Sequence, residues 1–407
     1  MDFARLCLAA RCACFRTSLA FGLLRAALAS ILLGGGVPLW RQVFVNVAAR
    51  FVFYAAEPSY FSGKVRPALR YKAVPYVEKL PTAAAYREVI VPRTGLAFIP
   101  ILITPEDETW QDTSEILDAL EARVPQPPLY PRTPLLRVLS LLFELYADEF
   151  LVLPAMHYRW SFPESETKAR ADFAAITGDP ESASRFASRM RGSIVALGVS
   201  AASIPGIEAH LAELLARFDA HLASHAYVLG SRMSLADCSL MGPFYAHLYL
   251  DAVPGRLLRE HAPRVCHWIE RMNHPDPAEP GEWLKETELP DSLRELLALI
   301  GRDAVPVLLD SLRAFEAWAD ARPAGITEPP RAVGFHETRL RGAVFQRYTS
   351  PYSLWMAQRT LDAFRALAPA ERARVEAVVA GTGCEALLAY APRHRVGKRR
   401  FKLVLES

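Results

Sequence analysis

Cysteine is scarce in this sequence, and the few cysteines present follow no recognised pattern. There are six in 407 residues, without a paired CxxC motif and without histidines at the intervals of zinc ligands. Neither a disulfide framework nor a metal site is therefore expected. Scattered cysteines of this kind are typical of buried thiols in a reducing compartment, which predicts a cytoplasmic protein.

A large excess of charge of one sign is also absent. The 47 basic residues nearly balance the 44 acidic residues and give a net charge of +3. Nothing in this balance favours nucleic acid or an acidic membrane surface as a partner. Hydrophobic residues make up 51% of the chain and charged residues 22%, as in a soluble globular protein, and the length predicts two or three domains.

Acidic residues are almost missing from residues 1–49, where Asp2 is the only one. This basic, apolar leader has three open interpretations: a targeting segment, a short apolar anchor through residues 26–40, or a poorly packed tail. Arg25 interrupts the apolar run and the glycines at 34–36 weaken a helix there. A membrane span is therefore not favoured, although membrane contact through the leader stays open.

Residues 50–124 alternate between strand-type and helix-type patterns. Aromatic and β-branched runs predict strands, whereas apolar residues at helical spacing after a capping residue predict helices. The predicted order is a strand at 51–54, a helix at 58–72, a strand at 74–78, a short irregular helix at 86–91, strands at 98–103 and 110–111, and a helix at 112–121. The prolines between residues 125 and 134 then predict an interdomain linker.

A helical domain is expected over residues 135–278. Apolar residues recur at helical intervals in 135–153 and in 206–223. Ser234 and Asp237 form a capping pair at the start of another helix, in which the serine and the aspartate each answer a free amide. We interpret this pair as structural and not catalytic.

The last part of the chain, residues 285–407, is predicted to be mainly helical. The expected elements are a helix at 289–321 broken or kinked at Pro306, a strand at 343–346, helices at 353–367 and 369–379, and a short strand at 401–405. The basic run Lys398-Arg399-Arg400 is interpreted as a solvated edge in preference to a nucleic-acid contact.

Several of these segments resemble glutathione S-transferases. The resemblance lies in residues 58–72, 99–102, 111–116 and, most specifically, 229–237. It implies an α/β plus all-α fold class: a thioredoxin-like glutathione-binding domain at 50–124, a helical transferase-type domain at 135–278 and a mainly helical carboxyl-terminal extension at 285–407. The extension looks like those of large family members, from which no activity carries over.

In that family glutathione is the co-substrate, and its sulfur is the nucleophile when it is held as a thiolate. The resemblance implies that Ser59, which follows Pro58 at the amino end of a helix, is the catalytic residue that donates a hydrogen bond to this sulfur. The plain alternative is that Ser59 only caps the helix, since capping and thiolate binding need the same location. Tyr54, Tyr60 and Ser62 are nearby rivals for the role.

Two other motifs complete the glutathione site that the resemblance implies. Pro100 resembles the cis-proline of the family, so Ile99 is expected to pair its backbone with the cysteinyl part of glutathione, unless Pro100 is only an edge-strand proline. Asp112 and Thr113 lie where the family binds the γ-glutamyl group at a helix amino terminus. Thr113 keeps the expected hydroxyl. Asp112 departs from the usual Glu or Gln and is unfavourable beside a carboxylate, unless it takes the ligand's ammonium group.

Two groups of polar residues stay without an assigned role. Lys64, Arg66 and Arg93 can help to bind the glycyl carboxylate, or they can simply be solvated. The stretch 157–160 can line a pocket for an apolar electrophile. Alternatively, its arginine can pair with Glu149 while its tryptophan packs in the core.

The resulting hypothesis is a glutathione transferase that joins glutathione to a small apolar electrophile, a detoxification reaction. Two alternatives stay open: a non-catalytic binding or interaction protein of the same fold, and a membrane-associated organiser anchored through residues 1–49. The resemblance also implies a homodimer, although the extension can occupy the surface that joins the two copies.

Overall fold

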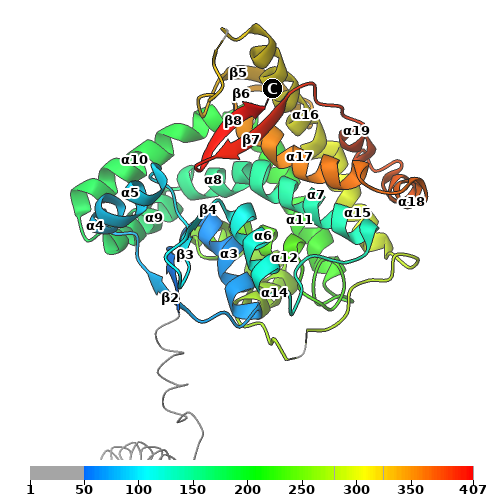
Figure 1. The fold of residues 1–407 in the computed structure, drawn as a ribbon, viewed down its shortest axis with the longest axis horizontal. Helices are drawn as coiled ribbons and strands as arrows, with labels where there is room; N and C mark the ends of the chain where they lie inside the picture. The colour runs from blue at the N-terminus through cyan, green and yellow to red at the C-terminus, as the bar shows by residue number, and fades with distance from the viewer. Residues whose placement is uncertain (1–49, 279, 324, 407) are drawn as a thin grey trace, which may run out of the picture.

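The computed structural model describes residues 50–278, 280–323 and 325–406 (Figure 1). The leader predicted at residues 1–49 lies outside the described residues. Within the described part of the chain, no helix is both long enough and apolar enough to cross a membrane.

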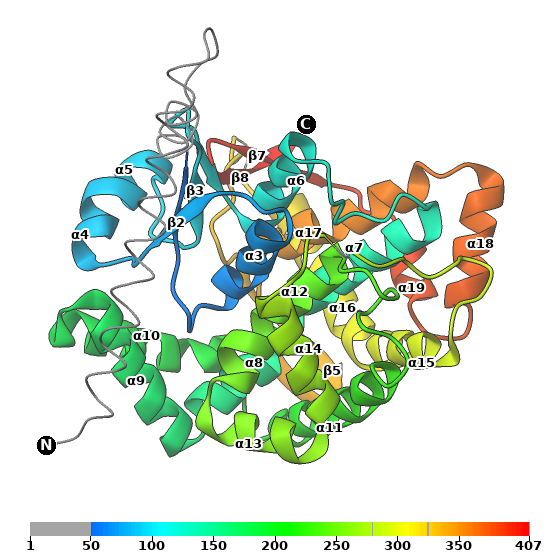
Figure 2. The same ribbon diagram turned by 90° about the horizontal axis from the view of Figure 1, so that it is seen from below.

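The first part of the chain is a four-stranded mixed sheet with helices on both faces (Figure 2). The strand order is β2-β1-β3-β4, in which β1 runs parallel to β2 and the other two pairs are antiparallel. The elements are β1 (Phe51–Tyr54), α3 (Tyr60–Tyr71), β2 (Tyr76–Lys79), α4 (Ala83–Ala85), η1 (Tyr86–Ile90), α5 (Val91–Thr94), β3 (Ile101–Ile103), β4 (Thr109–Gln111) and α6 (Thr113–Arg123). The predicted order of strands and helices, and with it the thioredoxin-like fold, is confirmed.

Successive side chains of β1 and β3 point to opposite faces of the sheet and pack against different helices. Phe53 and Leu102 pack in the main core together with residues of α3 and α6. Tyr54 and Ile101 belong instead to a small separate core with Ile90 of η1. Because successive strand residues point to opposite faces, β1 and β3 each contribute to both cores. Helices α3 and α6 therefore lie on the same side of the sheet, in contact with each other.

The second part is all-helical, as predicted. Its elements are α7 (Pro134–Glu149), α8 (Val152–Trp160), α9 (Pro163–Thr177), α10 (Pro180–Leu197), α11 (Ile204–His221), α12 (Leu235–Pro243), η2 (Phe244–Tyr249), α13 (Ala252–His261) and α14 (Pro263–Asn273). Helix α12 is buried along its whole length and packs against both α3 and α7, so it ties the two parts together. The predicted capping pair at its start is confirmed, because Asp237 accepts a hydrogen bond from the Ser234 amide at 3.0 Å.

The extension is mainly helical, as predicted, and ends in a two-stranded hairpin. Its elements are α15 (Asp291–Leu299), η3 (Ile300–Ala304), α16 (Val305–Ala321), β5 (Gly334–Leu340), β6 (Ala343–Thr349), α17 (Pro351–Arg365), α18 (Pro369–Val379), α19 (Glu385–Leu388), β7 (Arg395–Arg399) and β8 (Lys402–Glu406). The break predicted at Pro306 is a π-helical segment, η3, which ends just before this residue. Strands β5 and β7 were not predicted, because their sequences are too polar to show an apolar alternation.

The extension does not stand apart from the other two parts. Helix α17 lies along α7, and β7 runs beside α17 (Figure 1). One continuous core includes Leu69 from α3, Leu139 from α7 and Leu361 from α17. The predicted domain limits at residues 124, 278 and 285 fall in connections between helices, whereas the limit at residue 135 lies just inside α7. We keep these limits as a proposed division of a chain whose parts share this core.

Candidate functional site

Ser59 caps the amino end of α3. Its backbone is extended, with φ −89° and ψ 123°, and its Oγ accepts a hydrogen bond from the Ser62 amide at 3.3 Å. The side chain is half-buried, and its hydroxyl proton meets no acceptor in the part of the chain that the structure describes. The free amides and the dipole of a helix favour negative charge at this end. Ser59 can therefore cap α3 and still donate to an anion in front of it.

Arg159, on α8, holds the turn before Ser59 in place. Its Nη1 donates to the carbonyl of Pro58 at 2.8 Å. Its Nε and Nη2 donate to the two carboxylate oxygens of Asp251 at 2.7 and 3.1 Å. The predicted pairing of Arg159 with Glu149 is wrong, because Asp251 supplies the carboxylate. The Arg159 guanidinium thus fixes the turn that precedes Ser59 and α3.

The peptide bond between Ile99 and Pro100 is cis and immediately precedes β3. Pro100 is buried, whereas Ile99 is half-buried against the small core around Ile90. Strand β3 lies between β1 and β4, so the interpretation of Pro100 as an edge-strand proline is wrong. The amide and carbonyl of Ile99 bond to no other backbone group among the described residues. Both groups are therefore available to a ligand.

Asp112, between β4 and α6, already has partners from the extension. Its φ of 76° lies in the left-handed region, and its Oδ1 caps α6 by accepting from the Ser114 amide at 3.0 Å. Its Oδ2 accepts a hydrogen bond from the Tyr352 hydroxyl at 2.7 Å and forms an ion pair with the Lys398 ammonium at 2.8 Å. Thr113, the first residue of α6, is only 4% exposed. The two residues predicted to hold the γ-glutamyl group are thus covered.

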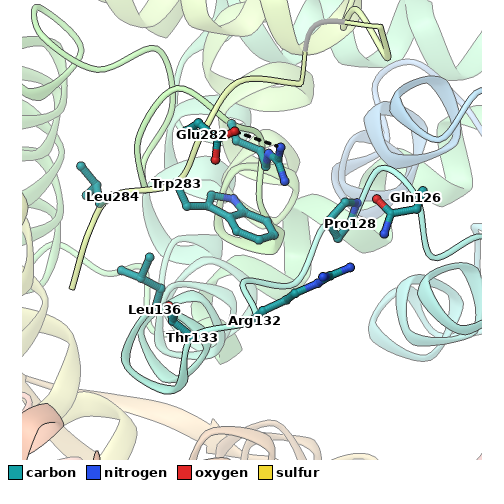
Figure 3. A pocket seen from close by; sticks show the side chains of 9 residues that line it. Gln126, Pro128, Arg132, Thr133, Leu136, Glu282, Trp283 and Leu284 are labelled. Carbon is teal, nitrogen blue, oxygen red and sulfur yellow. Dashed lines mark ion pairs between the residues drawn. The ribbon is translucent and has the colours of Figure 1, made fainter.

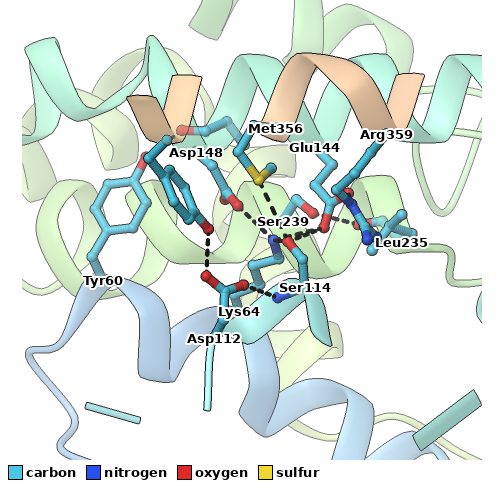
Figure 4. A network of polar contacts seen from close by, with 12 residues as sticks. Tyr60, Lys64, Asp112, Ser114, Glu144, Asp148, Leu235, Ser239, Met356 and Arg359 are labelled. Carbon is cyan, nitrogen blue, oxygen red and sulfur yellow. Dashed lines mark hydrogen bonds and ion pairs between the residues drawn. The ribbon is translucent and has the colours of Figure 1, made fainter. Parts of the chain in front are cut away.

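A buried ionic network lies directly behind these helix ends (Figure 4). Lys64 of α3 donates to Glu144 at 2.8 Å and to Asp148 at 2.6 Å, both on α7, and to the Ser114 hydroxyl at 3.0 Å. Glu144 also accepts from Arg359 of α17 at 2.9 Å. The network therefore links the first part, the helical part and the extension through charged hydrogen bonds.

The two carboxyl groups around Lys64 differ in their affinity for a proton. Burial raises the pKa of Asp148 to about 7, although Lys64 acts in the opposite direction. Burial also opposes ionisation of Glu144, but Lys64 and Arg359 outweigh it and lower the pKa to about 2. Glu144 has a lower pKa than Asp148 because a second cation, Arg359, also interacts with it. Glu144 is therefore the more acidic of the two carboxyl groups, and Asp148 binds a proton more tightly.

The chain matches two consecutive domains of one known family. The family model described as "Glutathione S-transferase, N-terminal domain" matches residues 53–128, and the one described as "Glutathione S-transferase, C-terminal domain" matches residues 206–276. Residues 53–128 and 206–276 of this chain therefore carry the amino-terminal and carboxyl-terminal domains of the glutathione S-transferase family. A comparison with curated proteins gave no match.

Several solved structures align with this chain at low identity. A glutathione S-transferase from Methylobacterium radiotolerans JCM 2831, in complex with glutathione sulfonate, is 20% identical with a TM-score of 0.35, over 60% of this chain and 98% of the other. The beta-etherase LigF from Sphingobium sp. strain SYK-6 is 16% identical with a TM-score of 0.41, over 56% and 97%. A Tau class enzyme from mango, Mangifera indica, is 17% identical with a TM-score of 0.33, over 61% and 96%.

Three of the basic residues whose role the sequence left open or placed at a solvated edge are largely buried, namely Lys64, Arg66 and Lys398. Lys64 is completely buried, and Arg66 binds Glu78 through two hydrogen bonds of 2.9 and 2.6 Å. The side chain of Lys398 is only 9% exposed, so its interpretation as part of a solvated edge is wrong. Arg93 alone of the three candidates for the glycyl carboxylate lies at the surface.

The stretch 157–160 does not line an open pocket in this transferase fold. All four of its side chains are buried. Trp160 packs in a small core with Met156 and Ala169, which confirms the interpretation of this tryptophan as a core residue. A pocket for an electrophile at this stretch is therefore not supported.

Two surface cavities lie away from the predicted site residues. The first, of about 380 Å³, lies between the linker after α6 and the segment before α15, with Arg132 and Trp283 in its wall (Figure 3). The second, of about 440 Å³, has Arg302 and Arg341 in its wall. None of the five predicted site residues lines either cavity.

Sequence reasoning missed the residues of the extension that reach the site. Tyr352, Met356 and Arg359 follow one another at intervals of four and three residues, which puts them on one face of α17. This spacing indicates that the three side chains share one contact face of α17. It does not identify the partner, because nothing local in α17 points to Asp112 or Glu144.

We expect Asp148→Asn to flatten the dependence of stability on pH. In the wild type the folded-state pKa, about 7, lies above the ordinary value of 3.8. Asp148 therefore binds a proton more tightly in the folded chain, and its contribution to stability is full below about pH 4 and is lost as the pH rises through about 7. Urea unfolding at about pH 5 and about pH 8 measures this loss.

The same measurement on Asp276→Asn supplies the control, because Asp276 is exposed. The control variant should follow the wild-type profile. Parallel profiles for the wild type and Asp148→Asn would show that Asp148 does not titrate in this range.

Proposed function

We propose that this chain binds glutathione as a co-substrate and that Ser59 stabilises its thiolate for attack on a small apolar electrophile. The observation that carries the proposal is the Ser59 hydroxyl, half-buried at the amino end of α3 with its proton free to donate. A hydrogen-bond donor and the positive end of a helix dipole together lower the pKa of a thiol. Ser59 thus favours the thiolate near neutral pH.

The neighbouring backbone supports the same proposal. The unpaired amide and carbonyl of Ile99, beside Pro100, suit antiparallel pairing with the cysteinyl residue of glutathione. At the other end of the ligand, Asp112 would take the ammonium group. Thr113 and the first amides of α6 would take the γ-glutamyl carboxylate.

The chemistry requires only that the thiol loses its proton and that the partner is held close. The proton passes to solvent when glutathione binds, and the sulfur then donates an electron pair to the electrophilic carbon. A carbon–sulfur bond forms, and either a leaving group departs with its bonding pair or the displaced electrons take up a proton from water. The protein contributes position and a stabilised thiolate.

A second candidate function is a non-catalytic binding protein of the same fold. The observation that favours it is the occupation of Asp112 by Tyr352 and Lys398, which competes with a ligand.

In either case we place the protein in the cytoplasm, as its cysteine usage suggests, and assembly as a homodimer stays a prediction. The cysteines that the structure describes, Cys238, Cys266 and Cys384, are buried and free.

Replacing Ser59 with alanine tests the catalytic proposal. We expect the wild type to bind glutathione and to show the ultraviolet absorbance of a bound thiolate near neutral pH. We expect Ser59→Ala to lose this absorbance and to conjugate an aryl halide about a hundredfold more slowly, because one donor to the developing charge is gone. Calorimetry and absorbance against pH measure both effects.

Ser59→Gly separates stabilisation of the thiolate from capping of α3. Alanine at the cap costs about 1 kcal/mol of stability, whereas glycine costs only a few tenths. Both variants lack the hydroxyl, so both should lose the thiolate although only Ser59→Ala is clearly destabilised. A wild type that does not bind glutathione would leave the non-catalytic candidate in place.

A further inference from the structure

The extension places a second amino group at the carboxylate of Asp112. The Lys398 ammonium lies 2.8 Å from Asp112 Oδ2, and the two side chains are 9% and 11% exposed. The Tyr352 hydroxyl donates to the same oxygen at 2.7 Å. An ammonium on this carboxylate is the same chemical contact that the α-ammonium of a γ-glutamyl group would make. Two such groups cannot use the same acceptor in the same place.

The position of Lys398 is well defined by its other neighbours. Its ammonium lies 3.5 Å from the ring centre of Trp355 and 3.2 Å from Glu115 Oε2. An aromatic face attracts a cation, and this attraction grows as water is excluded. Lys398 is thus held in a small cage of two acidic groups and an aromatic ring, at the amino end of α6.

The segment that carries Lys398 is a hairpin that packs against the main core through Val396 and Leu405. Strands β7 and β8 form a two-stranded sheet, and the Leu405 amide also donates to the Thr327 carbonyl at 2.7 Å. A hairpin of this kind is marginally stable by itself. Its contact with α17 includes a pair of hydrogen bonds, 2.8 and 2.9 Å long, between Gln358 and the backbone of Val396. Lys398 lies beside the exposed Arg399 and Arg400 at the turn of this hairpin, so its long, flexible side chain can leave Asp112 while the two strands stay packed.

We propose that Lys398, supported by Tyr352, is an intramolecular competitor of the γ-glutamyl group, so that glutathione binds at Asp112 only when the Lys398 side chain leaves this carboxylate. This inference rests on the proposed function, because it concerns the same site. It adds that the extension sets the affinity of that site. The ligand must displace one ion pair and one hydrogen bond before it reaches Asp112.

The test measures binding of S-methylglutathione to the full-length wild type, Lys398→Gln and Lys398→Arg by calorimetry. We expect Lys398→Gln to bind about tenfold more tightly, because the competing ion pair with Asp112 is gone. Lys398→Arg keeps the cation and should bind like the wild type. Lys402→Gln is the matched control, since Lys402 lies on β8 of the same hairpin with its side chain 55% exposed.

S-methylglutathione has no free thiol, so the result does not depend on Ser59. Failure of thiolate activation would leave the tenfold difference intact, whereas failure of the competition would not. Equal affinities of the wild type and Lys398→Gln would overturn the proposal, and so would a Lys398→Gln variant that does not bind.

Discussion

Replacing Lys64 with methionine is expected to lower the free energy of unfolding by about 3 to 5 kcal/mol. Lys64 is completely buried, and its ammonium is shared between Glu144 and Asp148. Methionine fills similar space but carries no charge. The two carboxyl groups would then lose their common cation, and burial prevents water from replacing it. Arg359 still reaches Glu144, so the loss falls mainly on Asp148.

Urea unfolding followed by circular dichroism measures this loss. Lys285→Met is the control, because Lys285 forms a surface pair with Glu288 at 3.6 Å and its side chain is 76% exposed. We expect it to change stability little. The double variant Lys64→Met/Asp148→Asn should recover part of the loss, since it removes one unpaired carboxylate. A single variant Lys64→Met as stable as the control would refute the proposed role of Lys64.

Replacing Asp237 with alanine is expected to cost a similar amount, about 3 to 5 kcal/mol. Asp237 is completely buried at the start of α12, the helix that joins the first two parts. Its carboxylate accepts from the amides of Val228 and Ser234 at 2.9 and 3.0 Å, and from the indole of Trp268 at 3.1 Å. Alanine leaves all three buried donors without a partner, which costs more than the loss of one ordinary hydrogen bond.

Thermal and urea unfolding of three variants separate the capping effect from the burial effect. Ser234→Ala removes only the hydroxyl that donates to Asp237 at 2.7 Å, so a loss of about 1 kcal/mol is expected. Asp276→Ala changes an exposed aspartate and should have almost no effect. If Asp237→Ala and Ser234→Ala proved equally stable, Asp237 would be no more than a helix cap.

Much of the fold could be predicted from the sequence because its signals are local. The strand at 51–54, the helix after Pro58 and the helix at 369–379 follow from short apolar patterns and capping residues. The capping pair of Ser234 and Asp237 could be predicted for the same reason. Strands β5 and β7 could not, because a two-stranded ribbon of polar residues lacks the alternation that marks a half-buried strand.

The candidate site could be predicted only in part. The position of Ser59 at the amino end of α3 follows from its neighbours in the chain. The partners of the basic residues do not follow from their neighbours in the chain. Lys64 and Arg66 have the composition of a solvated helix face, and only packing against α7 and Glu78 shows that both are buried ion-pair donors.

By itself the sequence determined the order of the elements, the places where helices begin and the identity of the residues at those helix ends, since each depends on contacts between near neighbours. Only the tertiary structure decided which residues contact those helix ends. Tyr352 and Asp112 are 240 positions apart, and a contact over such a distance depends on the packing of α17 against α7 and on the burial of charge around Lys64. Local patterns carry no information about that packing, because side chains that pair across the fold share no spacing along the chain.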